Sequence, residues 1–289
     1  YVDVLQNVFA VSSLSVADPL LSASKSFKVC SSYTELAQCD IVIIAHPTEL
    51  HVEAVEFFRS KAKALLIEKP LGLTYEESEG IVSILAQSRV TAMCGLTGLY
   101  HPEFRAMYTL LPQIGAVTHV REILHEASPE LQIYLQNERG VLTINGIHTL
   151  HRFWKIAHLL SPTETLRIEG VSLKKGAFPG AVGEDRATGV LRLAGSTFQF
   201  DVAYVNGPNC ANGWPIEYVT EIQGTHGAIR VTGWERCDSS IGGRWENAYA
   251  HPDGPLHGTS QYPRIRLGII EQVRDFFRFF REGGRLHHT

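Results

Sequence analysis

One lysine of this chain stands where a buried strand meets a turn, in the tripeptide Glu68-Lys69-Pro70. An ammonium group at the end of a buried strand is held rigidly and is partly removed from water, and burial disfavours its charged form. Such a lysine can approach the pKa that acid/base catalysis needs at neutral pH. The alternative is a surface lysine paired with a carboxylate, and position alone does not decide between the two.

A histidine, His148, is the second group that could carry chemistry, because it follows Gly146 at the start of a helix expected over residues 147–159. A helix N-terminus disfavours an imidazolium and offers backbone N–H groups to the oxygens of a ligand. A neutral imidazole there could accept a hydroxyl proton or donate to a carbonyl. The alternative is a capping or core histidine, which is how we interpret His151 and His158 on the same helix.

The elements that must position Lys69 alternate between strand and helix. Apolar runs predict buried strands, and apolar residues at helical spacing predict the helices between them. The expected strands are DIVIIAH (40–46), ALLIEK (64–69) and TAMCGL (91–96), and the expected helices are 50–62 and 75–87. Right-handed crossovers would wind these units into an open parallel sheet that binds ligands at the carboxyl ends of its strands. The turns at His46, Lys69 and Leu96 are therefore expected along one edge.

After Leu96 the pattern changes to runs of β-branched and aromatic residues separated by glycine, which predict an antiparallel sheet. The expected strands are 118–124, 165–173, 188–194, 196–205, 216–224 and 227–233, and the expected helices are 102–111, 147–159 and 267–281. The predicted fold class is α/β. A Rossmann-like, doubly wound parallel sheet occupies residues 1–97, and an α+β domain with a large, mainly antiparallel open sheet occupies residues 98–289.

Composition excludes several classes of protein. The 289 residues carry 26 Lys and Arg against 30 Asp and Glu, a net charge of −4, which argues against direct contact with nucleic acid. No apolar run approaches the roughly 20 residues of a membrane span, and no signal peptide is apparent, so a cytoplasmic protein is expected. The five cysteines are scattered, and the 13 histidines form no metal motif. We therefore expect neither a disulfide framework nor a metal site.

Four stretches of the chain, taken in order, resemble the glucose-fructose oxidoreductase / inositol dehydrogenase family (Gfo/Idh/MocA). They are DIVIIAHPTELHVEAV with KALLIEKPLGLTYEESEGIV, then GLTGLYHPEFRAMYTLLPQIGAVTHVRE, ERGVLTINGIHTLHRFWKI and EIQGTHGAIRV. The resemblance covers most of the chain from Val8 onward. It implies an N-terminal Rossmann domain that binds NAD or NADP, a C-terminal domain whose open sheet often forms a dimer face, and oxidation or reduction of a sugar or cyclitol hydroxyl.

The resemblance also assigns roles to individual residues. Lys69 matches the catalytic lysine of the Glu-Lys-Pro motif, and His148 matches the catalytic histidine of a Gly-x-His segment. Hydride transfer to or from nicotinamide would then be accompanied by proton acceptance at His148 and polarisation of the hydroxyl by Lys69. The cofactor-binding residues implied are Ala45, His46, Pro47, Thr48, His51, Glu68, Lys69 and Pro70, and the substrate-binding residues implied are Lys69, Asn145, His148 and Asp185.

Three features depart from the family. Ile144 stands four residues before His148, where the family often has an aspartate, so a carboxylate partner is lost or comes from elsewhere, for example from Asp185. Leu99 replaces a substrate-side arginine. The G-x-G-x-x-G turn that would cradle a pyrophosphate is absent, and the first strand that carries it is expected to lie before the chain begins.

The strand that carries the ribose-binding position admits two alignments. If the strand is 8–11, Ser12 or Ser13 faces the ribose, and the missing carboxylate tolerates a 2′-phosphate and favours NADP. If the strand runs to Ala17, Asp18 holds the ribose and NAD is favoured. We favour the first alignment, and hence NADP slightly over NAD, because the second leaves few residues for the next helix.

The sequence therefore predicts an NAD(P)-dependent oxidoreductase with a small-molecule substrate, assembled as a homodimer or homotetramer through its C-terminal sheet. Lys69 and His148, from separate domains, are expected to converge on one cleft. One alternative is a non-catalytic regulator of the same fold that senses a dinucleotide, which Ile144 and the absent glycine turn favour. Another is an incomplete, inactive member of the family.

Overall fold

The structure is a computed structural model that describes residues 1–9, 11–36, 38–127, 140–176, 181–205, 214–252, 262–283 and 286–287. The chain divides into two compact units, one made of Tyr1–Thr97 with Gly268–Thr289 and the other of Gly98–Leu267. The structure differs from the expected division in one respect, because the segment from Gly268 onward belongs to the first unit. Across the described ranges, every helix is too short or too polar to cross a bilayer.

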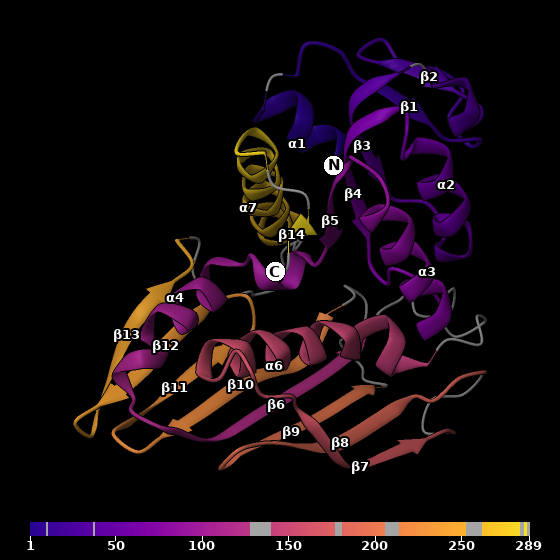
Figure 1. Cartoon of the computed structure of the whole chain (residues 1–289). Coiled ribbons are helices and arrows are strands. Elements are labelled where there is room, and N and C mark those ends of the chain that lie inside the picture. Colours follow the sequence, from indigo (N-terminus) through magenta and orange to yellow (C-terminus); the bar gives the residue numbers. More distant parts are fainter. Residues whose placement is uncertain are drawn as a thin grey trace. The chain divides into compact units, whose positions relative to one another are not determined.

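The first unit is built on a parallel sheet with the strand order β14-β5-β4-β3, as the sequence predicts for a Rossmann-like fold. β1 and β2 form a separate parallel pair. The strands are β1 (Ser15–Ala17), β2 (Lys28–Cys30), β3 (Cys39–Ile44), β4 (Ala62–Glu68), β5 (Thr91–Gly95) and β14 (Leu286–His287), and the helices are α1 (Val2–Asn7), α2 (His51–Phe58), α3 (Tyr75–Ala86) and α7 (Tyr262–Arg281). In Figure 1, α2 and α3 lie along one side of β3–β5, and α1 and α7 lie along the other.

Local sequence explains where these helices begin and what they cover. Thr74 caps α3, since its hydroxyl accepts from the Glu77 backbone N–H at 3.1 Å, while the Glu77 carboxylate accepts from the Leu73 N–H at 2.7 Å. The apolar face of α2, including Val55 and Phe58, is buried against the sheet. These contacts fix where α3 begins and which face of α2 packs against the sheet.

One prediction for the N-terminal segment is wrong. Val8 ends α1 in a helical conformation, so residues 8–11 are not the predicted strand, and the strand is β1. Between β2 and β3 the chain forms a single 3₁₀ turn, Tyr33–Glu35, capped by Ser32. A short apolar run fits the end of a helix as well as a strand, and neighbouring contacts decide between them.

The second unit is an eight-stranded sheet with helices against one face. Its order is β13-β12-β11-β10-β6-β9-β8-β7, and the pairing is antiparallel except between β6 and β9. The strands are β6 (Val117–Ala127), β7 (Arg167–Lys174), β8 (Arg186–Leu193), β9 (Ser196–Tyr204), β10 (Trp214–Gly224), β11 (Gly227–Thr232), β12 (Arg236–Ile241) and β13 (Arg244–Ala250), and the helices are α4 (Pro102–Leu110) and α6 (Ile147–Leu160). This unit also contains the 3₁₀ turn η4 (Leu111–Gln113) and the π-helical turn η5 (Leu142–Gly146). The 3₁₀ turn η2 (Thr48–Leu50) belongs to the first unit, and η3 (Thr97–Leu99) spans the division between the units. Figure 1 shows α4 and α6 on the same side of this sheet.

One buried ion pair joins α6 to the sheet. Arg152 and Glu122 are 1% and 0% exposed, and the guanidinium Nε donates to Glu122 Oε2 at 2.8 Å while a second nitrogen donates to Oε1. The hydroxyls of Thr149 and Thr220 also donate to this carboxylate, at 2.5 and 3.0 Å. The guanidinium carbon lies 4.7 Å from the Phe104 ring centroid. This hydrogen-bonded ion pair holds α6 against β6. Removing one partner of such a pair lowers the free energy of unfolding, because the other charge stays buried.

Arg152→Leu is expected to destabilise the second unit by about 3–5 kcal/mol, because it leaves the Glu122 carboxylate buried without its cation. All four tryptophans of the chain lie within residues 98–267, so urea unfolding followed by tryptophan fluorescence reports this unit. Arg244→Leu is the matched control, since Arg244 is 86% exposed and 3.9 Å from Glu246, and it should leave the curve nearly unchanged. Equal, small effects of both substitutions would contradict a structural role for the pair.

Candidate functional site

Three turns of the first unit lie along one edge because β3, β4 and β5 are parallel and paired in register. Ile44 pairs with Ile67, and Glu68 pairs with Gly95. The turns that leave this edge contain Ala45, His46, Pro47 and Thr48; Glu68, Lys69 and Pro70; and Leu96. The structure therefore brings together the predicted cofactor-binding residues that follow β3 and β4.

His51 ties two of these turns together. Its ring is fully buried, with Nδ1 3.0 Å from the Leu71 carbonyl oxygen and Nε2 3.2 Å from the His46 carbonyl oxygen. Burial lowers the pKa of His51, although the two carbonyl groups oppose the shift. Both ring nitrogens therefore face backbone carbonyl groups, and His51 connects the turn after β3 to the turn after β4.

The Glu68 carboxylate is fixed from two sides. Tyr1 donates its hydroxyl to Glu68 Oε1 at 2.5 Å, and the Lys69 backbone N–H donates to Oε2 at 3.0 Å. Burial, followed by the nearby Glu68 charge, raises the pKa of Tyr1, so the phenol stays a donor. A side chain at Gly95 would approach the Glu68 Cα within 3.0 Å. The absence of a side chain at Gly95 therefore allows Glu68 to pack closely against β5.

Gln272, on α7, continues this network from the far end of the chain. In the orientation of its amide that satisfies its neighbours, its oxygen accepts from the Leu96 and Thr97 backbone N–H groups at 2.8 and 3.2 Å. Its nitrogen then donates to the hydroxyls of Tyr1 at 2.9 Å and Thr97 at 3.1 Å. Gln272 is fully buried. The helix therefore holds the turn after β5 and, through Tyr1, the carboxylate beside Lys69.

The edge of the sheet offers chemistry that suits a nicotinamide dinucleotide. His46 Nδ1 lies 3.1 Å from the Pro47 carbonyl oxygen, whereas Nε2 is buried and has no hydrogen-bond partner among the described residues. Lys69 is half-buried and precedes a cis peptide bond to Pro70. The turn from Ala45 to Thr48 and the Lys69 ammonium are the groups that would lie along such a cofactor.

The strand that leads to the predicted ribose-binding position is β1, so the assignment of Ser12 and Ser13 rests on a strand that the structure does not contain. Both serines precede β1 and are exposed. Asp18 follows β1 directly, and its Oδ1 accepts from the Leu20 N–H at 2.8 Å while its own N–H donates to the Cys30 carbonyl at 3.1 Å. Asp18 therefore follows a strand, as in the second alignment, which placed Asp18 after an apolar run that ends at Ala17.

His148 lies farther along its helix than the sequence suggests. The π-helical turn η5 runs directly into α6, and Gly146 already has a helical conformation. The expectation that His148 stands at a helix N-terminus is therefore wrong. Its Nδ1 is buried, and a side chain at Gly98 would come within 3.0 Å of that atom and 3.1 Å of a guanidinium nitrogen of Arg152. A glycine at position 98 lets the backbone pack against the imidazole.

Asn145 and Ile144 occupy the turn before His148. Ile144 is 9% exposed and has no carboxylate to offer. The amide of Asn145 donates instead to the carboxylate of Glu126, near the end of β6. Glu126 was not among the predicted site residues, although it continues the alternation of β6 that turns Val120, Glu122 and Leu124 toward the helices.

Asp185, the carboxylate suggested as a partner for His148, is fully buried at the start of β8. Its Oδ2 accepts from the Gly176 N–H at 2.9 Å, and its backbone bonds to Lys174 and Tyr204. These contacts bind Asp185 to neighbouring loops and strands. Its predicted role toward a substrate gains no support from them.

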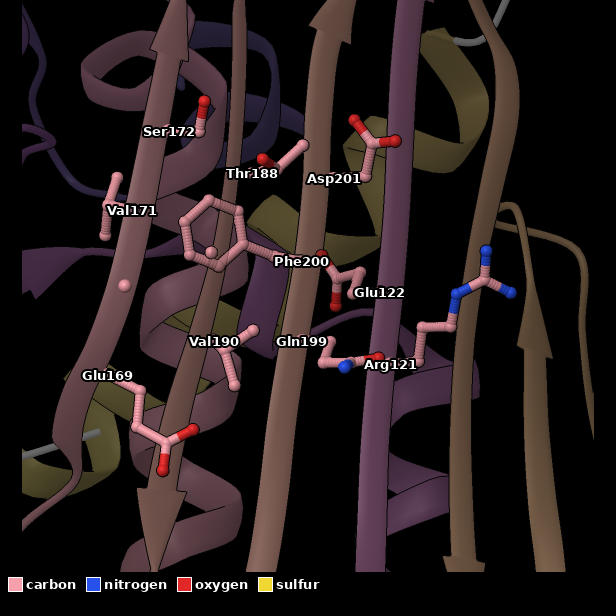
Figure 2. Close-up of a pocket in the computed structure, with 12 residues that line it drawn as sticks. Arg121, Glu122, Glu169, Val171, Ser172, Thr188, Val190, Gln199, Phe200 and Asp201 are labelled. Carbon is pink, nitrogen blue, oxygen red and sulfur yellow. The ribbon is translucent and has the colours of Figure 1, made fainter.

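A groove of about 600 Å³ lies on the open face of the large sheet. Figure 2 shows its side chains in front of β6 to β9, with the helices behind the strands; Arg121, Glu169, Thr188, Gln199 and Asp201 are among them. None of the predicted site residues lines it. Within the described residues, no cluster of three or more His, Cys, Asp or Glu side chains could hold a metal ion.

A parallel α/β sheet whose turns gather at its carboxyl edge is typical of the doubly wound class of folds, which includes the dinucleotide-binding Rossmann fold. Residues 6–96 match the model of the GFO_IDH_MocA family, described as an oxidoreductase family with an NAD-binding Rossmann fold. The predicted resemblance to this family is confirmed over residues 6–96.

Two curated relatives from Rhizobium meliloti match part of the chain. Inositol 2-dehydrogenase of strain 1021 is 26% identical over 114 residues, which cover 39% of this chain and 34% of the relative. The rhizopine catabolism protein MocA is 26% identical over 100 residues, 32% of each chain. The matched segments therefore span about a third of these relatives.

Solved structures match the fold over most of the chain. An oxidoreductase from Agrobacterium radiobacter in complex with NAD⁺, L-tartaric acid and magnesium superposes with a TM-score of 0.74 at 22% identity, covering 89% of this chain and 75% of that one. A levoglucosan dehydrogenase in complex with NADH and levoglucosan superposes with a TM-score of 0.69 at 18% identity, with the same shares covered. At these identities the likeness shows the two-part α/β fold.

The electrostatics beside Arg152 predict a pH dependence of stability. His101 is 3% exposed and stacks on Trp234 with ring centroids 5.5 Å apart, and its Nδ1 lies 3.9 Å from a Glu103 oxygen. Burial, with a further effect of Arg152, lowers the pKa of His101 from 6.5 to about 3. Below pH 6.5 the unfolded chain therefore binds a proton that the folded chain rejects, and stability falls as the pH drops toward 3.

Between pH 7 and pH 5 this histidine should cost the second unit about 2 kcal/mol of unfolding free energy. His101→Phe keeps a ring on Trp234 and removes the titration, so its unfolding free energy should change by about 2 kcal/mol less over the same interval. Urea unfolding at both pH values, followed by tryptophan fluorescence, measures the difference. Identical pH dependence in the two proteins would show that His101 is protonated in the folded state.

Proposed function

We propose that this chain is an NAD-dependent dehydrogenase or reductase acting on a CH–OH group of a sugar-like substrate. The observation that carries the proposal is the in-register edge of β3, β4 and β5, which gathers the His46, Lys69 and Leu96 turns within the segment that matches an NAD-binding family. The names of the relatives and of the structural neighbours, which include inositol and levoglucosan dehydrogenases, support a polyhydroxylated substrate.

When bound, the nicotinamide cofactor supplies the hydride acceptor or donor, and the chain supplies position and proton transfer. The Lys69 ammonium polarises the substrate oxygen. The backbone N–H of Lys69 is hydrogen-bonded to the Glu68 carboxylate. His148 exchanges the proton at Nε2, because Nδ1 is buried against Gly98. Lys69 and His148 belong to different units, and their joint action stays a prediction.

We propose NAD as the cofactor, although the sequence slightly favours NADP. The preference for NADP rested on a strand over residues 8–11, whereas Asp18 follows the strand that the structure contains. A carboxylate at this position accepts from the ribose hydroxyls and repels a 2′-phosphate. NAD⁺ and NADH are the nucleotides named with the neighbouring structures.

A regulator that binds the dinucleotide without turnover is the second candidate. The feature that favours it is Ile144, which is buried and apolar where the family often has an acid. If the chain is a regulator, it should bind NADH and turn over no sugar or cyclitol.

We also propose a homodimer or homotetramer formed through the open face of the large sheet, in a cytoplasmic protein. The helices α4 and α6 cover one face, and the other carries exposed groups such as Trp245, which is 49% exposed. The described cysteines form no disulfide with one another, which suits a reducing compartment.

Lys69→Ala is expected to lower kcat at least about a hundredfold with little change in the Kd of NADH, because it removes a group that acts on the reacting oxygen. His148→Asn should act similarly on kcat. The matched controls are Lys63→Ala, on the same strand and paired with Asp40 at the surface, and His158→Asn, at the exposed end of α6. Steady-state rates with NAD⁺ and a panel of sugars and cyclitols test both, and wild-type rates in either variant would remove that residue from the mechanism.

Asp18→Ser should weaken NADH binding and raise the ratio of NADPH to NADH affinity at least about tenfold, because it removes the charge that repels a 2′-phosphate. Asp40→Ser, on the exposed start of β3, is the control and should leave the ratio unchanged. Calorimetric titration with both nucleotides gives the ratio. A wild-type chain that prefers NADPH, or an unchanged ratio in Asp18→Ser, would contradict the assignment.

A further inference from the structure

The side-chain amide of Gln272 uses its whole hydrogen-bonding capacity inside the first unit. Its oxygen accepts from the backbone N–H groups of Leu96 and Thr97, and its nitrogen donates to the hydroxyls of Thr97 and Tyr1. An amide offers two acceptor sites and two donors, so all four are occupied. Gln272 is fully buried. A buried polar group that is satisfied in this way has one orientation, and it fixes the helix that carries it.

Gln272 joins two stretches of chain that are separated in sequence by the whole second unit. The chain leaves the first unit after Thr97 and returns to it at Gly268, within α7. Gln272 follows Gly268 by about one helical turn, and it binds the last two residues before the chain leaves. The hydrogen bonds that hold the turn after β5 to α7 therefore form only when α7 is docked on the first unit.

Apolar contacts also dock α7. Val273 and Phe276 are fully buried, and the Phe277 ring packs edge-on against the Phe9 ring, with centroids 5.1 Å apart. After the helix, β14 pairs in parallel with β5. Because these contacts do not involve the amide of Gln272, we expect the helix to stay docked when that amide is removed.

The amide of Gln272 also reaches the Glu68 carboxylate, through the phenol of Tyr1. The Gln272 nitrogen lies 2.9 Å from the phenol oxygen, and the phenol donates to Glu68 Oε1 at 2.5 Å. The other carboxylate oxygen accepts from the Lys69 backbone N–H at 3.0 Å. A phenol has a single proton to donate, so Tyr1 can serve Glu68 only while the side chain at position 272 is a donor to Tyr1.

We propose that Gln272 is a positioning residue for the cofactor and makes the docking of α7 a condition for tight dinucleotide binding; the inference rests on the function proposed above. Its amide gives the turn after β5 one shape through Thr97, and the turn after β4 one shape through Tyr1 and Glu68. Affinity is higher when the bound shape is formed in advance, because binding then does not have to order the turns. Since coupling between two binding events is reciprocal, the bound cofactor should in turn stabilise the docked α7.

Calorimetric titration with NADH at about pH 6 and about pH 8.5, on either side of the raised pKa of a carboxyl group placed beside another carboxylate, compares Gln272→Ala and Gln272→Glu with the wild-type chain. Gln272→Ala should raise the Kd about tenfold at both pH values, because the Thr97 N–H and the Tyr1 phenol lose their partner. Gln272→Glu should raise the Kd more at the higher pH, because an ionised carboxylate cannot donate to the phenol, whereas a protonated one can. Arg278→Ala, at a 64% exposed side chain of the same helix, is the matched control and should keep the wild-type Kd.

Hydrogen exchange measured by mass spectrometry tests the reciprocal effect. Saturating NADH should slow exchange in residues 268–281 of the wild-type chain and leave it unchanged in Gln272→Ala. Tyr1→Phe removes only the hydroxyl between Gln272 and Glu68, and it should also raise the Kd of NADH. The two substitutions break the same connection, so their combined effect on the Kd should be smaller than the product of the single effects.

The outcomes separate this inference from the proposed function. A wild-type chain that does not bind NADH contradicts both, whereas NADH binding without turnover of any sugar or cyclitol contradicts the dehydrogenase alone. An unchanged Kd in Gln272→Ala, or an equal effect of Gln272→Glu at both pH values, contradicts the positioning role. Thermal melting by circular dichroism identifies a Gln272 variant that has lost its fold, and an unchanged Kd in Tyr1→Phe then contradicts the role.

Discussion

The parallel register of β3, β4 and β5 is the constraint on which the first unit depends. Strands that run in one direction end at one edge, so residues more than 20 positions apart in sequence leave the sheet together. The turns at this edge are then fastened to one another. His51 joins the turn after β3 to the turn after β4, and Gln272 joins the turn after β5 to the phenol that holds Glu68. Lys69 therefore lies at a sheet edge whose three turns are connected by the hydrogen bonds of His51, Gln272 and Tyr1.

The second unit uses a different device, a buried charge pair, to place its helix. The bond between Arg152 and Glu122 fixes α6 against β6, and the backbone at Gly98 packs against both Arg152 and His148. An apolar contact would tolerate rotation of the helix about its axis. Two parallel hydrogen bonds between a guanidinium and a carboxylate fix both this rotation and the position of the helix along its axis. The position of His148, and that of Asn145 one turn earlier, follow from this pair.

The sequence predicted those parts of the fold in which local pattern and tertiary contacts agree. The buried strands β3 to β5 are apolar runs between polar turns, and the residues of the His46 and Lys69 turns were predicted with them. The N-terminal strand was misplaced because β1 is only three residues long and half-buried, while residues 8–11 form a more apolar run. The π-helical turn before α6 has no sequence signal, so His148 was placed at a helix start. Tyr1, Gln272 and Glu126 act through partners that are distant in sequence, and local pattern cannot reveal such contacts.

Hydrogen exchange measured by mass spectrometry, with and without saturating NADH, reports on backbone amides at the β3–β5 edge without requiring turnover. We expect NADH to slow exchange in residues 45–51, 68–71 and 95–97, where the three turns leave the sheet, and to leave exchange unchanged in β7, at the edge of the large sheet. No protection at these turns, or protection confined to the large sheet, would contradict the assignment of the β3–β5 edge as the binding site for the cofactor.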